Sequence, residues 1–72
     1  MEAVDVLVDA RGLRCPLPLL RARAALSAMA PEDVLIVLAD DREAPIDLAA
    51  LASDVGRPFA DDGAGRFVLG GR

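Results

Sequence analysis

Hydrophobic and polar residues alternate in some segments of the chain, and hydrophobic residues form continuous runs in others. These two patterns predict four strands. Residues 4–9 place Val4, Val6 and Val8 on one face and polar or exposed positions on the other, the pattern of a strand with one buried face. Residues 34–39 are apolar throughout, which predicts a central strand partly covered on both faces. Residues 59–60 and 66–69 predict two short strands, the second with Phe67 and Leu69 on one face.

Two further segments repeat their apolar residues at steps of three and four, which predicts helices. The first helix is expected to begin at Cys15, with Pro16 in its first turn, and to be stopped by Pro31. The second is expected from about Pro45 to Val55, with Gly56 as its stop. The expected core-facing residues are Leu19, Ala22, Leu26 and Met29 in the first helix and Leu48, Leu51, Ala52 and Val55 in the second.

The predicted order is β-α-β-α-β-β, in one domain spanning residues 1–72. Two helices and four short strands fit an α+β fold, a two-layer α/β sandwich with a four-stranded mixed sheet. Right-handed crossovers place both helices on one face of that sheet. Too little chain remains to cover the other face, so Leu7, Val68 and alternate residues of 34–39 are expected to form an exposed apolar patch.

The charge of the chain is acidic and unevenly distributed. The net charge is −4, but residues 1–30 carry +1 and residues 31–72 carry −5. Nucleic-acid-binding proteins are usually basic and rich in aromatic residues, so two Phe and an acidic balance argue against direct nucleic-acid binding. Arg21 and Arg23 have two interpretations, a solvated helix face or a docking patch beside Cys15 for an acidic partner.

Composition also limits the compartment and the possible metals. A single cysteine forms no internal disulfide, which fits a reducing compartment, and we expect a cytoplasmic protein without a membrane span. With one Cys and no His, a zinc site is not expected, and the acidic turn at residues 61–65 lacks the ligand spacing of a calcium loop. No metal or cofactor is therefore predicted.

Cys15 is the candidate nucleophile, because the sequence contains no His or Lys for the common nucleophile–base pairs. It lies in Cys15-Pro16-Leu17-Pro18, between a predicted strand and a predicted helix. A helix N-terminus, with Arg11 and Arg14 nearby, is expected to lower the pKa of the thiol. A buried structural cysteine is the alternative interpretation, and the local pattern alone leaves both open.

The decapeptide from Asp9 to Pro18 resembles the signature of the TusA/SirA-like sulfur-carrier family, Asp-x-x-Gly-x-x-Cys-Pro-x-Pro after the first strand. The length and the order of elements fit that family as well. The resemblance implies that Cys15 carries sulfur as a persulfide, that Gly12 forms the turn, and that Pro16 and Pro18 fix the loop. It also implies that Asp9 ties the strand end to the loop. Arg11 and Arg14 are candidates for electrostatic roles because they are charged and close to Cys15 in the sequence, and family members vary at both positions.

The resemblance further implies a protein that receives sulfane sulfur from a cysteine desulfurase or rhodanese-like donor and passes it to an acceptor protein. The pathways it implies are tRNA thiolation, molybdenum-cofactor sulfur supply and sulfur oxidation, and the sequence does not select one. Transfer of this kind needs an exposed thiolate and no general base, so a site without His suffices. Some relatives have a second cysteine in the second helix, which residues 44–55 lack, and the segment Arg42 to Pro45 also departs from the relatives.

Two alternatives from other functional classes remain open. In the first alternative, the protein is a non-catalytic adaptor or regulator that binds partners through the open sheet face. In the second, it is a thiol redox sensor that is oxidised at Cys15. The residues leave open whether the protein is an enzyme in the strict sense, that is, a sulfurtransferase of the persulfide-carrier type. A bare sheet face also fits either a monomer or a weak dimer.

Overall fold

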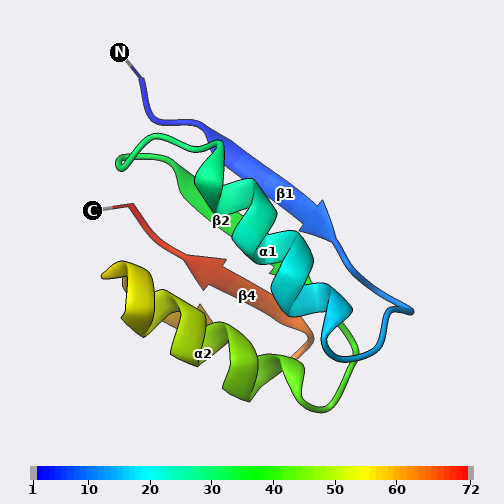
Figure 1. Cartoon of the computed structure of the whole chain (residues 1–72). Coiled ribbons are helices and arrows are strands. Elements are labelled where there is room, and N and C mark those ends of the chain that lie inside the picture. Colours follow the sequence, from blue (N-terminus) through cyan, green and yellow to red (C-terminus); the bar gives the residue numbers. More distant parts are fainter. Residues whose placement is uncertain (1, 72) are drawn as a thin grey trace.

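The structure is a computed structural model that describes residues 2–71. Its elements follow the predicted order and are shown in Figure 1. Their bounds are β1 Asp5–Asp9, α1 Leu17–Ser27, β2 Val34–Leu38, α2 Ala44–Val55, β3 Phe59–Asp61 and β4 Arg66–Leu69. The predicted α+β class, with four strands and two helices, is confirmed.

The four strands form one mixed sheet in the order β1-β2-β4-β3. β1 and β2 are parallel, with Leu7 opposite Ile36, and β4 runs antiparallel to both of its neighbours. Parallel β1 and β2 require a crossover, which α1 provides. Their carboxyl ends therefore meet at one edge, where the segments leading to α1 and to α2 begin.

Both helices cover the same face of the sheet, as predicted (Figure 1). The core between the two layers is built from fully buried aliphatic side chains, with Phe67 stacked at 6.2 Å on Phe59. Alanines let the helices approach the sheet closely, because they add little side-chain volume. The largest fully buried side chains are those of Leu35, Val37, Leu48 and Leu69.

The predicted bounds of the first helix are wrong at both ends. The helix begins at Leu17 rather than Cys15, because Arg14 to Leu17 form a separate turn closed by a 2.8 Å bond from the Leu17 N–H to the Arg14 carbonyl. It ends at Ser27, before the predicted stop at Pro31. The Ala30 N–H binds the Asp33 carboxylate instead of continuing the helical ladder, so Met29 packs on the core from a loop.

The remaining boundary differences are small. α2 begins one residue before Pro45, and its C-cap Gly56 has a positive φ of 71°, the conformation expected of a glycine stop. β1 begins after Val4, which is 55% exposed, so the predicted burial of that side chain is wrong. β2 ends at Leu38, and β3 extends to Asp61.

The face of the sheet away from the helices carries a row of apolar side chains. The strand register aligns Leu7, Ile36, Val68 and Ala60 across all four strands. Leu7 at one end of this row is 62% exposed, and Ile36 and Val68 are half-buried. The open apolar face predicted from the sequence is therefore present.

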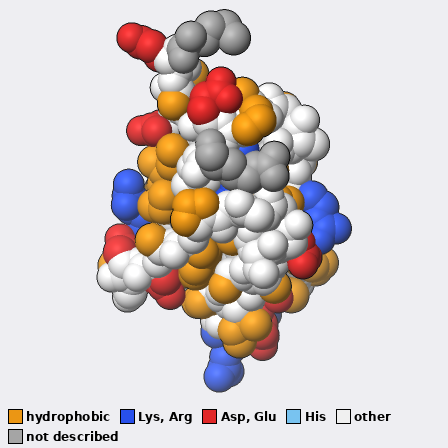
Figure 2. Space-filling model, turned by 90° about the vertical axis from the view of Figure 1, so that its left-hand side faces the viewer, with side chains coloured by type: hydrophobic (Ala, Val, Ile, Leu, Met, Phe, Trp, Pro, Cys, Tyr) orange, Lys and Arg blue, Asp and Glu red, His pale blue; other side chains and the backbone are white. Residues whose placement is uncertain are grey.

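Arg57 closes the end of the molecule opposite Cys15. Its guanidinium donates to the carbonyls of Ala30 at 3.0 Å, Gly70 at 3.1 Å, and Asp33. It thus joins the α1–β2 loop to the segment after β4. Figure 2 shows hydrophobic side chains at the surface across the middle of one face, arginines mainly at its margins, and acidic side chains at the margins and on its upper part.

Candidate functional site

Cys15 lies in the connection between β1 and α1, and its free thiol is exposed. The alternative of a buried structural cysteine is therefore excluded. The Cys15–Pro16 peptide bond is cis. Because this connection leaves the carboxyl end of β1, it lies beside the segment between β2 and α2, which supplies the neighbouring carboxylates.

Asp9, at the end of β1, binds Arg11 in two ways. Its carboxylate accepts the Arg11 guanidinium at 2.7 and 2.9 Å and the Arg11 backbone N–H at 3.2 Å. The side-chain bonds, followed by the backbone bond, lower the pKa of Asp9 to about 2. The same pair raises the pKa of Arg11. Asp9 thus joins the strand end to the loop, and it binds one of the two arginines that were expected to act on Cys15.

Gly12 turns the chain toward Cys15 with a φ of 81°, a left-handed conformation that glycine adopts without steric cost. Its backbone N–H donates to both carboxylate oxygens of Asp40, at 3.0 and 3.1 Å. Asp40 follows β2, so the end of this central strand anchors the cysteine loop. No role for Asp40 in the loop was predicted from the sequence.

The thiol of Cys15 contacts a carboxylate from the second helix. Sγ donates to Oδ2 of Asp47 at 3.5 Å, across 32 residues of sequence. Asp47 lies in the first turn of α2, and its side chain is half-buried. This contact joins the cysteine loop to α2.

The expected lowering of the Cys15 pKa is wrong in direction. The hydrogen bond to Asp47 raises the pKa of the thiol, together with some loss of hydration and the charges of Asp47, Asp41 and Glu43. A carboxylate that accepts the thiol proton favours the neutral form, and further negative charges oppose the thiolate. All of these effects favour the neutral thiol over the thiolate.

The start of α1 explains why a helix N-terminus does not reverse this effect. Pro16 and Pro18 have no backbone N–H, and the Leu17 N–H is bonded to the Arg14 carbonyl. The first turn therefore has few donors left for the sulfur. Pro16 is the N-cap residue rather than the first helical residue that was predicted, whereas the buried Pro18 lies in the first turn of α1 as predicted.

The other arginines predicted at the site lie apart from the thiol's contacts. Arg14 is exposed and lines a hollow with Asp40, Asp41 and Arg42. Arg21 is exposed on α1, which agrees with a solvated helix face. Arg23, two residues further along α1, lines the groove between the two helices.

Exposed apolar residues flank the contact between Cys15 and Asp47. Leu17 is 43% exposed at the first position of α1, and Leu20 is 49% exposed one turn later. Ile46, next to Asp47, is 68% exposed. Together they give the cysteine end of the molecule an apolar surface that a partner protein can cover.

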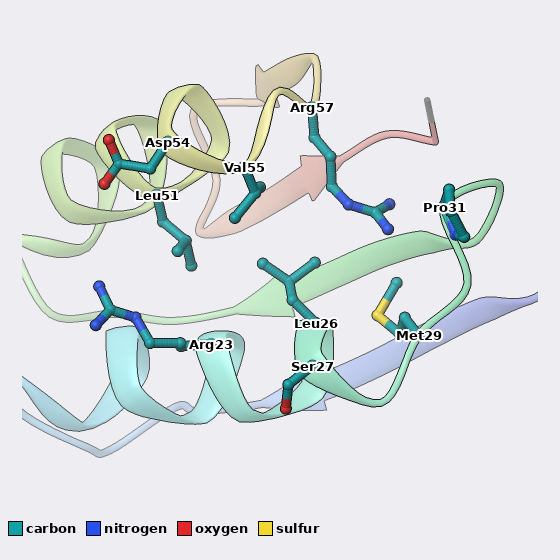
Figure 3. Close-up of a pocket in the computed structure, with 9 residues that line it drawn as sticks. All are labelled: Arg23, Leu26, Ser27, Met29, Pro31, Leu51, Asp54, Val55 and Arg57. Carbon is teal, nitrogen blue, oxygen red and sulfur yellow. The ribbon is translucent and has the colours of Figure 1, made fainter.

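A groove of about 640 Å³ separates the C-terminal halves of the two helices (Figure 3). Leu26 of α1 and Leu51 of α2 point toward each other across it, and Arg57 reaches from the end of α2 toward the α1–β2 loop. Arg23 of α1 and Asp54 of α2 also line it. The groove is at the end of the helices away from Cys15, so it is not part of the cysteine site.

Within residues 2–71 no three His, Cys, Asp or Glu side chains are grouped so as to hold a metal ion. None of the helices in that range is both long enough and apolar enough to cross a membrane.

Of the side chains that contact the cysteine loop, Asp40 and Asp47 were not predicted. The sequence offers one signal for Asp40. It directly follows the apolar run of the central strand, and the carboxyl ends of parallel strands meet at the same edge of the sheet. For Asp47 the sequence shows only a position in the first turn of a predicted helix. That position explains a favourable interaction with the helix dipole but does not predict a contact with Cys15.

The fold and the cysteine loop define a class of small α+β proteins with one exposed cysteine ahead of the first helix. The model of the family described as sulfurtransferase TusA matches residues 6–67. The chain belongs to this TusA/SirA-like sulfur-carrier family, and we conclude that it is a sulfur carrier protein of the TusA family.

Individual relatives agree. The chain is 48% identical over 54 residues to a candidate sulfur carrier protein of Neisseria meningitidis, covering 75% of this chain and 73% of that one. It is 41% identical over 61 residues to the sulfur carrier protein TusA of Allochromatium vinosum, covering 85% and 80%. A SirA-like protein of Desulfitobacterium hafniense has the same fold, with a TM-score of 0.69 at 25% identity over 96% of this chain and 99% of that one.

Proposed function

We propose that this protein carries sulfur as a persulfide on Cys15, between a donor protein and an acceptor protein. The observation that carries the proposal is the exposed, free thiol of the only cysteine, in the loop that bears the family's Cys-Pro-x-Pro signature. An exposed sulfur can both attack a donor persulfide and be attacked in turn. The absence of a second cysteine in the sequence prevents an internal disulfide from discharging the carrier.

The donor class is a protein that holds sulfane sulfur on a cysteine, such as a cysteine desulfurase or a rhodanese-like protein. The apolar residues Leu17, Leu20 and Ile46 beside Cys15 support direct docking, because a partner must bring its own sulfur into contact with Sγ. The acceptor belongs to a thiolation pathway, for tRNA, for the molybdenum cofactor or for sulfur oxidation. The proposed compartment is the reducing cytoplasm, where a lone thiol stays free.

The acidic surroundings of Cys15 change the partner chemistry expected from the sequence. Asp41, Glu43 and Asp47 all act on the thiol, so a partner with basic residues around its own sulfur complements this end better than an acidic one. The segment Arg42 to Pro45 lies among these acids and is proposed to affect partner choice.

Mass spectrometry of the intact protein tests the proposal. After incubation with a cysteine desulfurase and cysteine, the wild-type protein is expected to gain the mass of sulfur, and dithiothreitol is expected to remove it. The Cys15→Ser variant is expected to gain nothing. A wild-type protein that remains unmodified by a desulfurase, by a rhodanese-like donor with thiosulfate and by glutathione persulfide contradicts the proposal.

The open sheet face supports a second candidate function, partner binding without sulfur transfer. Its basis is the apolar row from Leu7 to Ala60, of which Leu7 is 62% exposed. A Val68→Asp substitution would then abolish function while Cys15→Ser would preserve it. A thiol redox sensor would also act through Cys15, and it predicts a sulfenic acid or mixed disulfide under peroxide with no gain of sulfane sulfur.

A further inference from the structure

We propose that Asp47 is a positioning residue for Cys15: its carboxylate holds the Sγ proton, keeps the free carrier in the thiol form, and retains that proton nearby while sulfur is transferred. The proposal rests on the proposed persulfide chemistry and adds a second residue to it. The geometric basis is the 3.5 Å contact between Sγ and Oδ2 of Asp47.

Both partners of this contact are held by rigid parts of the fold. Asp47 lies in the first turn of α2 between Ala44 and Leu48, whose side chains are buried and fix that turn against the sheet. The cysteine loop is fastened to the end of β2 by the bond from Gly12 to Asp40. A contact between two anchored segments has a small entropic cost of ordering, so it persists although Cys15 is exposed.

The charges around the thiol act in the same direction as Asp47. Asp41 and Glu43 approach from the segment between β2 and α2, and both oppose a negative charge on sulfur. From the cysteine's own loop, the Arg11 guanidinium is engaged by Asp9, and Arg14 is exposed to solvent. Every charged group that shifts the titration of Cys15 is a carboxylate, so the thiol has no cation to offset them among residues 2–71.

The transfer step balances with a persulfide donor of the form R–S–S–H. The Cys15 sulfur forms a bond to the terminal sulfur of the donor, the donor's S–S bond breaks, and its electron pair remains on R–S⁻. The proton of Sγ, held at Asp47, passes to that leaving thiolate. The products are R–S–H and Cys15–S–S–H, with no external oxidant or reductant, and Asp47 is again a carboxylate.

The loaded carrier then differs from the free one at this contact. Sγ no longer bears a proton, so the hydrogen bond to Asp47 is lost. A persulfide is a stronger acid than a thiol, and its anion is repelled by Asp41, Glu43 and Asp47. The outer sulfur therefore turns away from α2 toward solvent, where an acceptor can reach it.

The rate of alkylation of Cys15 by iodoacetamide, measured from pH 6 to 10, tests the role of Asp47, because only the thiolate reacts. Asp47→Asn keeps the shape and an acceptor oxygen but removes the charge. We expect its thiol to titrate at lower pH, with alkylation at pH 7 about two- to fivefold faster, the size expected of one exposed charge. Asp54→Asn, an exposed position on the same helix away from Cys15, is the matched control and is expected to leave the profile unchanged.

Two further measurements separate charge from structure. Asp47→Glu, which keeps the charge, is expected to retain slow alkylation. High salt, which screens exposed charges, is expected to speed alkylation of the wild-type protein at pH 7 and to have a smaller effect on Asp47→Asn. An Asp47→Asn profile equal to that of the wild type overturns the proposal. If that variant does not fold, a salt-insensitive wild-type profile overturns it instead.

The outcome is distinguishable from a failure of the proposed function. Persulfide loading is measured separately by intact mass. A protein that acquires no sulfur but whose titration shifts in Asp47→Asn refutes the carrier chemistry and leaves the thiol contact established. A protein that acquires sulfur while the titration is unchanged refutes only the role of Asp47.

Discussion

The carboxylate of Asp40 accepts the backbone N–H of Gly12, so the loop that carries Cys15 is tied to the end of a central strand 28 residues further along the chain. The bond fixes the turn at the point where its φ is positive. A thiol three residues after such an anchor can be exposed without being loosely placed. The strand that forms the middle of the sheet thus also determines where the sulfur lies.

Removing this anchor is expected to destabilise the fold modestly and loosen the cysteine loop. In Asp40→Ala the Gly12 N–H loses its partner, and because the group is exposed to water the cost is about 0.5–1.5 kcal/mol in the free energy of unfolding. Urea denaturation measures it. Asp40→Asn, which retains an acceptor oxygen, is expected to lose less. Equal losses in the two variants would show that the charge of Asp40, rather than the bond to Gly12, is what matters.

The pair of Asp9 and Arg11 is expected to make stability depend on pH in the acid range. The pKa of Asp9 is lowered from 3.8 to about 2 in the folded protein, so the unfolded chain binds the proton more readily. The contribution of the pair is therefore complete above about pH 4 and is lost as the pH falls through 2. Urea midpoints from pH 2 to 6 should show wild type and Asp9→Asn converging at the acid end.

A matched control for this titration is available on the same strand. Asp5→Asn removes an exposed carboxylate that forms no ion pair with any residue from 2 to 71. Its difference from the wild type should change less between pH 4 and pH 2 than that of Asp9→Asn. A constant gap between the wild type and Asp9→Asn over this range would contradict a titrating role for Asp9.

The strands and the order of elements were predictable from the sequence because they depend on local patterns. The alternation around Val6 and Val8 and the apolar run of β2 each report burial directly. The ends of α1 were not predictable in this way. They depend on which groups take the backbone hydrogen bonds, and at Ala30 that group is the Asp33 side chain.

The position of the candidate site was likewise predictable, but its electrostatics were not. The motif identified Cys15, and Arg11 and Arg14 were the nearest charges in the sequence. In the fold, Arg11 is bound by Asp9, and the acids near the thiol come from residues 41–47. Charges that are about 30 residues away in sequence decided the direction of the pKa shift, and only the packing of α2 brings them close.

Arg57 is expected to be the arginine whose loss destabilises the fold most. Its side chain is 8% exposed and donates to three backbone carbonyls from two separate segments. Arg57→Ala leaves these acceptors without their donor, at a cost of about 2–4 kcal/mol. Arg57→Lys is expected to be intermediate, since one ammonium group cannot reproduce the planar fork.

Arg23→Ala is the comparison for this prediction. Arg23 is exposed at the edge of the groove, so its removal is expected to change stability by less than about 0.5 kcal/mol. Thermal or urea unfolding of the three variants gives the ranking. An Arg57→Ala protein as stable as Arg23→Ala would mean that water replaces the guanidinium at these carbonyls without loss.

The turn between β3 and β4 offers a test of backbone packing with two glycines that differ in one respect. Gly63 and Gly65 both have positive φ, of 80° and 85°, so alanine at either position pays a similar conformational cost of about 1–2 kcal/mol. A Cβ at Gly63 meets open space, whereas one at Gly65 would lie 2.9 Å from the Ala39 carbonyl oxygen, beside the bond that joins Ala39 to Gly65. Gly65→Ala is therefore expected to unfold at a lower urea concentration than Gly63→Ala.

Because Ala39 immediately precedes Asp40, the Gly65→Ala substitution is also expected to disturb the anchor of the cysteine loop and accelerate alkylation of Cys15. Equal stability of the two variants would show that the end of β2 shifts freely, and would weaken the view that this strand fixes the position of the sulfur.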